Sequence, residues 1–240
     1  MKKHCTLFLV VLVLMIALLV IPAFAIQSGL TMHPMDKAEI ERINQKRNVE
    51  IYQEPILRAI SCFDVSEEGK MALGHATSLS NNYAKISVFD REFNFLYGIQ
   101  FKIRGSYYIS WSGEDLLIYT VRNDIAAVYD ANGTCLEMMK CDISAENDAY
   151  VRKVLASKKR TAGAYTYELK NNFGLLDLFT TSYSYLMRTD AFGNNEVLYN
   201  ANSEYLPRLI LSILFIKIIC VFGIWFTVKR FEQMKKEKEI

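Results

Sequence analysis

The sequence predicts a mainly β, antiparallel domain held between two long apolar segments, and three observations lead to this prediction. Short aromatic and β-branched runs alternate with turn residues from residue 57 onward, a pattern typical of antiparallel strands joined by tight turns. A short motif recurs along the same region. Apolar runs lie near both ends of the chain, and each is long enough to cross a bilayer, because about 20 helical residues cover its hydrocarbon core.

Composition narrows the class of protein. The 240 residues are 51% apolar and 22% charged, which excludes a disordered chain. The net charge is only +2, whereas nucleic-acid-binding domains usually carry a strongly basic face. No nucleic-acid partner is therefore expected, and the five cysteines are too few for a disulfide scaffold.

The first apolar run covers residues 6–25, follows Lys2 and Lys3, and contains no charged residue. Two interpretations of residues 1–25 stay open. One is an uncleaved transmembrane anchor. The other is a signal peptide cleaved after Ala25, where Ala23-Phe24-Ala25 fits an A-x-A site, although the run exceeds the ~7–15 apolar residues usual in signal peptides.

The second apolar run predicts a transmembrane helix at residues 208–228, followed by a basic tail at residues 229–240. Five basic residues follow Val228, and only Arg208 stands close to the other end. Basic residues collect on the cytoplasmic side of a span. The chain is therefore predicted to lie in the cell membrane with its C-terminus cytoplasmic and residues 26–207 extracytoplasmic, whether or not the first run is cleaved.

Lys217 lies near the middle of the second run. A central lysine raises the free energy of insertion by ~2.5–3.5 kcal/mol, and charges within a membrane commonly mark functional sites. The first run contains no acidic residue, so the two runs cannot form a salt bridge. Lys217 is therefore the candidate interaction residue, through which another membrane protein would bind. The alternative is that its long side chain reaches the interface unaided.

A motif repeats within the predicted β domain at residues 57–207. Ile86-Ser-Val-Phe-Asp90 returns about forty residues later as Ala126-Ala-Val-Tyr-Asp130, and a looser echo ends at Asp190, before Gly193-Asn194. A period near 40 with four strands per unit is typical of propeller blades. Over residues 57–141 the chain resembles the β-propeller-type blade repeats of bacterial membrane-anchored surface proteins.

The resemblance implies four-stranded antiparallel meanders, but too few of them for a closed ring. About eleven or twelve strands are expected, which make at most three blades, whereas a closed propeller has ~4–8. The domain is therefore expected to be an open, twisted sheet or sandwich, or a unit that closes as a homo-oligomer.

Two short helices are predicted beside the strands. Residues 26–56 are expected to form a stalk with a polar helix over residues 35–47. A second helix begins at Ser144, a suitable N-cap, and carries an apolar stripe at Val151, Val154 and Leu155. The basic run that ends at Arg160 is expected at the exposed C-terminal end of this helix, where it complements the helix dipole.

No motif for catalysis or metal binding is present. The three histidines lie far apart, and the sequence contains no H-E-x-x-H, no C-x-x-C and no glycine-rich phosphate loop. The aspartates that follow the strands are expected to hydrogen-bond within turns: Asp64, Asp90 and Asp130. Cys62, Cys135 and Cys141 are expected to be buried thiols, although the sequence leaves their disulfide status open.

The predicted function is a membrane-anchored extracytoplasmic binding or interaction module that is not an enzyme and uses no cofactor or metal. Two alternatives remain. One is an accessory subunit of a larger membrane complex, such as a transporter or cell-envelope machine, with Lys217 as its positive feature. The other is an extracytoplasmic hydrolase, which requires two carboxylates facing one cleft.

Overall fold

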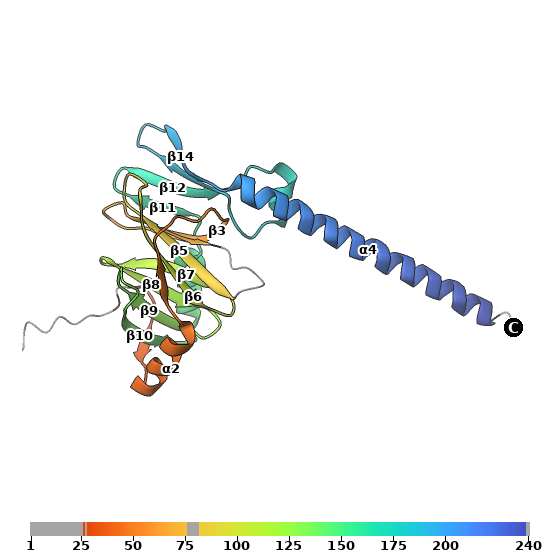
Figure 1. Ribbon diagram of the computed structural model, residues 1–240, viewed down its shortest axis with the longest axis horizontal. Helices are drawn as coiled ribbons and strands as arrows, with labels where there is room; N and C mark the ends of the chain where they lie inside the picture. The colour runs from red at the N-terminus through yellow and green to blue at the C-terminus, as the bar shows by residue number, and fades with distance from the viewer. Residues whose placement is uncertain (1–25, 27, 76–81, 239–240) are drawn as a thin grey trace, which may run out of the picture.

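The computed structural model describes residue 26, residues 28–75 and residues 82–238, so the predicted signal or anchor segment at residues 1–25 lies outside it. Within the described part the protein is mainly β, with three antiparallel sheets, a few short helices and one long C-terminal helix. The coarse fold prediction is therefore confirmed. Figure 1 shows the sheets stacked one above another and the long helix leaving the stack near its upper end.

Each sheet contains a meander of four consecutive strands. The meander of the first sheet consists of β3 (Ile60–Val65), β4 (Met71–His75), β5 (Tyr83–Phe89) and β6 (Phe95–Lys102). The second consists of β7 (Tyr107–Ser112), β8 (Asp115–Thr120), β9 (Ile125–Tyr129) and β10 (Cys135–Cys141). The third consists of β11 (Lys159–Ala162), β12 (Tyr165–Lys170), β13 (Tyr185–Thr189) and β14 (Asn195–Asn200).

The repeated motif occupies the same hairpin in all three sheets, between the third and fourth strands of each meander. The turns open with Asp90, Asp130 and Asp190. Each Oδ1 accepts a hydrogen bond from the backbone N–H four residues later, at 2.7–2.9 Å. The residue before that donor has a positive φ in every case: Phe93, Gly133 and Gly193. The predicted turn role of Asp90 and Asp130 is therefore confirmed.

Two apolar cores set the stacking order of the sheets. The core between the first and second sheets contains Ile86, Val88 and Phe101 on one side and Ile109, Ile118 and Tyr129 on the other. The core between the first and third sheets contains Phe63, Leu73, Phe89, Tyr167, Leu186 and Tyr199. The first sheet therefore lies in the middle with both faces covered, and β4 is buried along its whole length.

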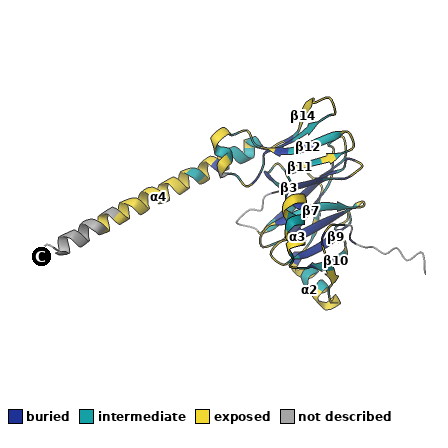
Figure 2. Ribbon diagram, turned by 180° about the vertical axis from the view of Figure 1, so that it is seen from behind, coloured by how far each residue is buried: buried dark blue, intermediate teal, exposed yellow. Residues whose placement is uncertain are grey.

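The outer face of the second sheet is covered by a helix. Helix α3 (Ala145–Tyr150) begins at Ser144, whose side chain accepts a hydrogen bond from the backbone N–H of Asn147, so the predicted N-cap is confirmed. The helix continues into the π-helical turn η1 (Val151–Leu155). Leu155 packs with Ile26 and Leu30 against this face. Figure 2 shows the buried strands of the second sheet next to α3.

Residues 26–56, for which the sequence predicts a stalk, are integrated into the sheets. Strand β1 (Met32–Pro34) pairs with β10, and strand β2 (Glu50–Tyr52) pairs with β6. Between them lies helix α2 (Lys37–Arg47). The structure differs from the prediction because each short strand covers a sheet edge that would otherwise leave backbone groups unpaired, and three-residue strands give no periodic signal.

Helix α4 (Asn202–Lys238) follows β14 directly and contains the predicted span at residues 208–228. Among the described residues, one helical stretch is long and apolar enough to cross a membrane: Asn202–Thr227. Only 6% of its most apolar part is buried against the rest of the protein. At 1.5 Å per residue, the 37 residues of α4 extend well beyond the hydrocarbon thickness of a bilayer. The predicted basic tail continues the same helix as far as Lys238.

Candidate functional site

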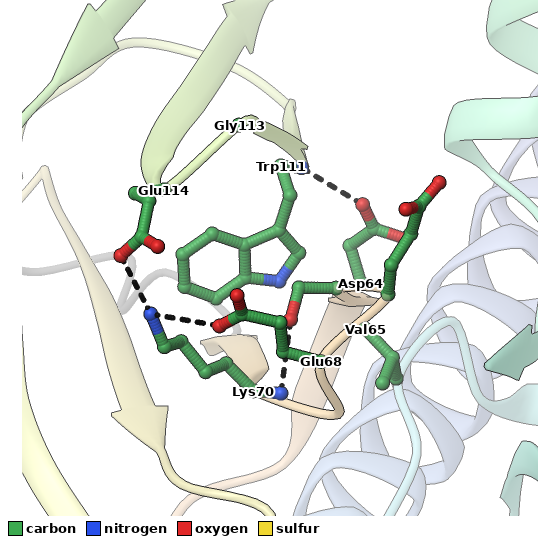
Figure 3. Close-up of a pocket in the computed structure, with 9 residues that line it drawn as sticks. Asp64, Val65, Glu68, Lys70, Trp111, Gly113 and Glu114 are labelled. Carbon is green, nitrogen blue, oxygen red and sulfur yellow. Dashed lines mark hydrogen bonds and ion pairs between the residues drawn. The ribbon is translucent and has the colours of Figure 1, made fainter. Parts of the chain in front are cut away.

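A pocket of about 420 Å³ lies between the turn after β3 and the turn after β7 (Figure 3). The β3–β4 turn is ordered by Ser66, whose Oγ accepts a hydrogen bond from the N–H of Lys70 at 3.0 Å. Gly69 occupies the turn at a φ of +89°, a conformation that glycine adopts without strain. The lining residues are Asp64, Val65, Ser66, Glu67, Glu68, Lys70, Trp111, Gly113 and Glu114.

Asp64 reaches this pocket from β3 and joins all three sheets. Its Oδ1 accepts a 2.7 Å hydrogen bond from Nε of Arg160 on β11. Its Oδ2 accepts hydrogen bonds from the backbone N–H of Trp111 at 2.9 Å and from Oγ of Ser110 at 3.1 Å, both on β7. The side chains of the ion pair are only 12% and 13% exposed, so the carboxylate is neutralised where the sheets meet.

This ion pair corrects two predictions. Asp64 does not hydrogen-bond within a turn, unlike Asp90 and Asp130, because it lies inside β3 and faces a buried guanidinium. Arg160 does not lie at an exposed helix end, because the chain enters β11 at Lys159. The remaining guanidinium nitrogens of Arg160 donate to carbonyl oxygens at the end of η1 and in the segment that follows it, which fixes its orientation.

The open side of the pocket is acidic. Nζ of Lys70 contacts Oε2 of Glu114 at 2.8 Å and Oε2 of Glu68 at 3.3 Å. The hydrogen bond to Glu114 raises the pKa of Lys70, and the same contact lowers the pKa of Glu114. Glu67 is exposed. Two cations, Lys70 and Arg160, therefore face four carboxylates, so the pocket carries a net negative charge.

Trp111 provides an aromatic wall to the pocket. In the view of Figure 3 its indole lies between Asp64 and the ion pair of Lys70 and Glu114. Its Nε1 is buried and has no hydrogen-bond partner among the described residues. The pocket therefore combines an aromatic face, negative charge and an unused donor, which are features of a ligand site.

Glu114 does not have the electrostatics of a glycosidase's proton donor. Such an enzyme needs one carboxyl group held protonated by a raised pKa. Glu68 and Glu114 are close neighbours because they contact the same ammonium group, but the contact with Lys70 lowers the pKa of Glu114. Glu114 is therefore poorly suited to donate a proton.

A second polar group is buried between the first and third sheets. Nδ1 of His75 lies 3.3 Å from the carbonyl oxygen of Arg58, and its Nε2 lies 2.8 Å from Oγ of Ser87. Because a carbonyl only accepts, Nδ1 carries the proton and Nε2 accepts from Ser87. Ser87 also contacts the hydroxyl of Tyr52 at 3.0 Å. Burial lowers the pKa of His75 to about 4, which keeps this chain of hydrogen bonds neutral.

The remaining reactive groups form no centre in the part of the chain that the structure describes. No three His, Cys, Asp or Glu side chains there lie close enough together to hold a metal ion. Cys62, Cys135 and Cys141 are free thiols, the first and last of them buried. Burial raises the pKa of Cys141 to about 11, so this thiol is unreactive at neutral pH.

Lys217 is exposed on α4, and the residues three and four positions from it along the helix carry no charge: Ile213, Leu214, Cys220 and Val221. The structure therefore leaves its predicted contact with another membrane protein as a prediction. Lys217 is far along the sequence from the residues that line the pocket. The pocket itself was not predicted from the sequence. The pocket's one sequence signal is the acidic and glycine-containing character of its two turns, at Glu67-Glu68-Gly69 and Gly113-Glu114.

Comparisons with known proteins add no family: no protein-family model matches the chain, and a search of curated proteins finds no match.

Proposed function

We propose that this protein is a membrane-anchored extracytoplasmic binding module. The observation that supports the proposal is α4, which leaves the stacked sheets as an exposed apolar helix of membrane-spanning length. Such a surface is unfavourable in water and favourable in lipid. The basic residues after Val228 favour the orientation with the C-terminus in the cytoplasm and the sheets outside.

The orientation is tested by labelling cysteines in intact cells with an impermeant thiol reagent. Ala131→Cys lies on the exposed turn between β9 and β10, and Glu237→Cys lies in the basic tail. Both variants carry Cys135→Ser, because Cys135 is a free and partly exposed thiol in the native chain. The first is expected to be labelled and the second to be protected until the cells are permeabilised. The reverse pattern would contradict the orientation, and release of the chain by alkaline carbonate would contradict the anchor.

We further propose that the pocket around Trp111 is the ligand site and that its ligand is cationic. The negative charge of the pocket attracts a cation, and an indole face stabilises an ammonium or guanidinium group by a cation–π interaction. The ion pair of Asp64 and Arg160 gives the pocket a rigid base, because it connects strands of all three sheets.

A polyamine serves as the probe. In a Trp225→Phe background Trp111 is the only tryptophan, so its fluorescence reports binding of spermidine to the solubilised full chain. Glu67→Gln is expected to weaken binding about fivefold, because one unit charge at 4 Å is worth about 1 kcal/mol in water. Glu92→Gln removes an exposed carboxylate outside the pocket and serves as control. Equal affinities of these two variants, or no saturable change in fluorescence, would overturn the cationic ligand.

The three sheets are proposed to be blade-like repeats of the propeller type, arranged as an open stack. Support comes from the shared four-stranded meander and from the shared hairpin at Asp90, Asp130 and Asp190. The outer face of the second sheet packs on η1 and residues near the N-terminus. Closure as a homo-oligomer remains the alternative, and the mass of the solubilised particle distinguishes the two.

The second candidate function is an accessory subunit of a larger membrane complex. It is favoured by one observation, the exposed ammonium group of Lys217 within the apolar helix. A charge at this depth is stabilised by a partner of opposite charge. A contact through α4 and a ligand in the pocket are compatible, since they involve different parts of the molecule.

A further inference from the structure

The connection between β12 and β13 exposes apolar side chains. It contains the 3-10 helix η2 (Gly174–Phe179). Leu175 is 82% exposed and Leu178 is 81% exposed. Asp177 is the single charged residue between residues 171 and 184. A surface turn of this composition is unusual, because loops of water-soluble domains are mostly polar.

The connection is held in place by hydrogen bonds at its base. Nδ2 of Asn171 donates to Oγ1 of Thr180 and to the carbonyl oxygen of Ser182, both at 2.9 Å. Oδ1 of Asn171 accepts from the N–H of Ser184 at 2.8 Å. Oδ1 of Asp177 accepts from the N–H of Phe173 at 3.2 Å, so the one charged side chain is turned to the backbone. These hydrogen bonds fix the orientation of η2, in which the side chains of Leu175 and Leu178 are exposed.

The position of η2 relative to α4 identifies what covers it. The ring of Phe173 lies 5.8 Å, centroid to centroid, from the ring of Tyr205 in the first turns of α4. Tyr205 precedes Leu209 by four residues, or about 6 Å along the helix axis. Figures 1 and 2 both show the connection beside the start of α4. When α4 crosses a bilayer, η2 therefore lies at the boundary between headgroups and acyl chains.

We propose that η2 inserts into the outer leaflet at this boundary, with Leu175 and Leu178 in contact with lipid. The inference rests on the proposed membrane anchor, and it adds a second contact that fixes how the stacked sheets lie on the membrane. Short apolar segments with few charges bind this boundary by burying their apolar face a few ångströms deep. Tyr205 on the adjacent helix is of a residue type enriched at this depth.

Quenching by brominated lipid tests the proposal on the full chain in nanodiscs. In a Trp111→Phe background Trp225 is the only tryptophan. It lies three residues before Val228, at the inner end of the predicted span, so its emission is expected to fall with lipids brominated near the headgroup. In the Trp111→Phe/Trp225→Phe background, the single indole introduced by Leu178→Trp is expected to be quenched most strongly by lipids brominated near the headgroup. Leu136→Trp is the matched control, because Leu136 is also an exposed leucine and its strand β10 lies at the end of the stack away from α4 (Figure 1).

The outcomes separate the two proposals. If Trp225 is not quenched, the membrane anchor is wrong. If Trp225 is quenched but Leu178→Trp is quenched no more than Leu136→Trp, the anchor stands and insertion of η2 is overturned; the leucines then contact protein or water.

A second measurement uses the native side chains, because tryptophan itself favours the interface. Amide hydrogen exchange across residues 173–180 is expected to be faster in the Leu175→Ser/Leu178→Ser variant than in the wild type, both in nanodiscs. Exchange at the Asp130 hairpin is expected to stay unchanged. Equal exchange across residues 173–180 in the two proteins would overturn the proposal.

Discussion

At the scale of single residues, the ion pair between Asp64 and Arg160 connects strands that are distant in the sequence. Asp64→Ala leaves the mostly buried guanidinium without its carboxylate, and loss of one partner of a buried pair costs about 3–5 kcal/mol. We expect this loss in the free energy of unfolding of the solubilised full chain, measured by urea titration. Asp64→Leu/Arg160→Met is expected to recover most of it, because apolar replacement of both partners removes the unpaired charge.

The control for this prediction is the pair of Arg188 and Glu196, in which the glutamate side chain is 60% exposed. Exposed pairs contribute at most about 1 kcal/mol, so Glu196→Ala is expected to have a small effect. If Asp64→Ala costs no more than Glu196→Ala, the ion pair does not hold the sheets together.

His75 makes stability depend on pH in a defined window. Its pKa is lowered to about 4 in the folded protein and is about 6.5 in an unfolded chain. Between about pH 6.5 and about pH 4 the ring of His75 binds a proton in the unfolded chain but stays neutral in the folded protein. The stability is therefore complete above about pH 6.5 and is lost as the pH falls toward 4, by up to about 3 kcal/mol.

The measurement for His75 compares urea unfolding at pH 7.5 and pH 4.5 in the wild type and in His75→Gln. The glutamine variant has no titrating ring, so it is expected to lose less stability than the wild type between these two pH values. Carboxylates contribute equally to both proteins and cancel in the comparison. Parallel pH profiles of the two proteins would show that His75 is not the group responsible.

At the scale of elements, the hairpins were predictable from the sequence, and the edge strands β1 and β2 were not. The hairpin at Asp130-Ala-Asn-Gly-Thr134 depends on local chemistry: an aspartate accepts backbone hydrogen bonds, and a glycine takes a positive φ. Strands β1 and β2 depend on partners about fifty to one hundred residues away, and no local pattern encodes such pairing. The pocket was not predictable for the same reason, since the two turns that line it belong to different sheets.

The turn glycines allow a matched comparison. Gly133 and Gly193 both have positive φ, but a Cβ at Gly133 would lie 3.1 Å from Cδ1 of Ile51 in β2, whereas a Cβ at Gly193 would meet nothing within 4 Å. Gly193→Ala is expected to lower the free energy of unfolding by about 1–2 kcal/mol from the backbone conformation alone. Gly133→Ala is expected to cost more, because crowding of β2 is added. Thermal unfolding of the two variants checks the order, and equal costs would exclude the contact with β2.

At the scale of the whole molecule, the stack and the long helix have different surfaces. The middle sheet is buried on both faces, so the β part has its own core. The exposed apolar side chains are concentrated on α4, and η2 beside it adds two more leucines. The apolar helix was predictable from the length of its run, in which Lys217 is the one charged residue. The exposed leucines of η2 were not predictable, because the sequence alone does not show whether leucines in a loop are buried or exposed.

Lys217 provides the test of the accessory-subunit function proposed for the whole molecule. It lies eight residues beyond Leu209, about 12 Å along the helix axis, and its face of the helix is otherwise apolar: Ile213, Leu214, Cys220, Val221 and Ile224. If a partner of opposite charge binds there, Lys217→Leu is expected to insert at least as well as the wild type and to lose the partner on purification from the native membrane. Lys217→Arg keeps the charge and is expected to keep the partner. Should Lys217→Leu retain every partner that the wild type and Lys217→Arg retain, the lysine is tolerated through its reach to the interface, and the binding module stands without the accessory-subunit function.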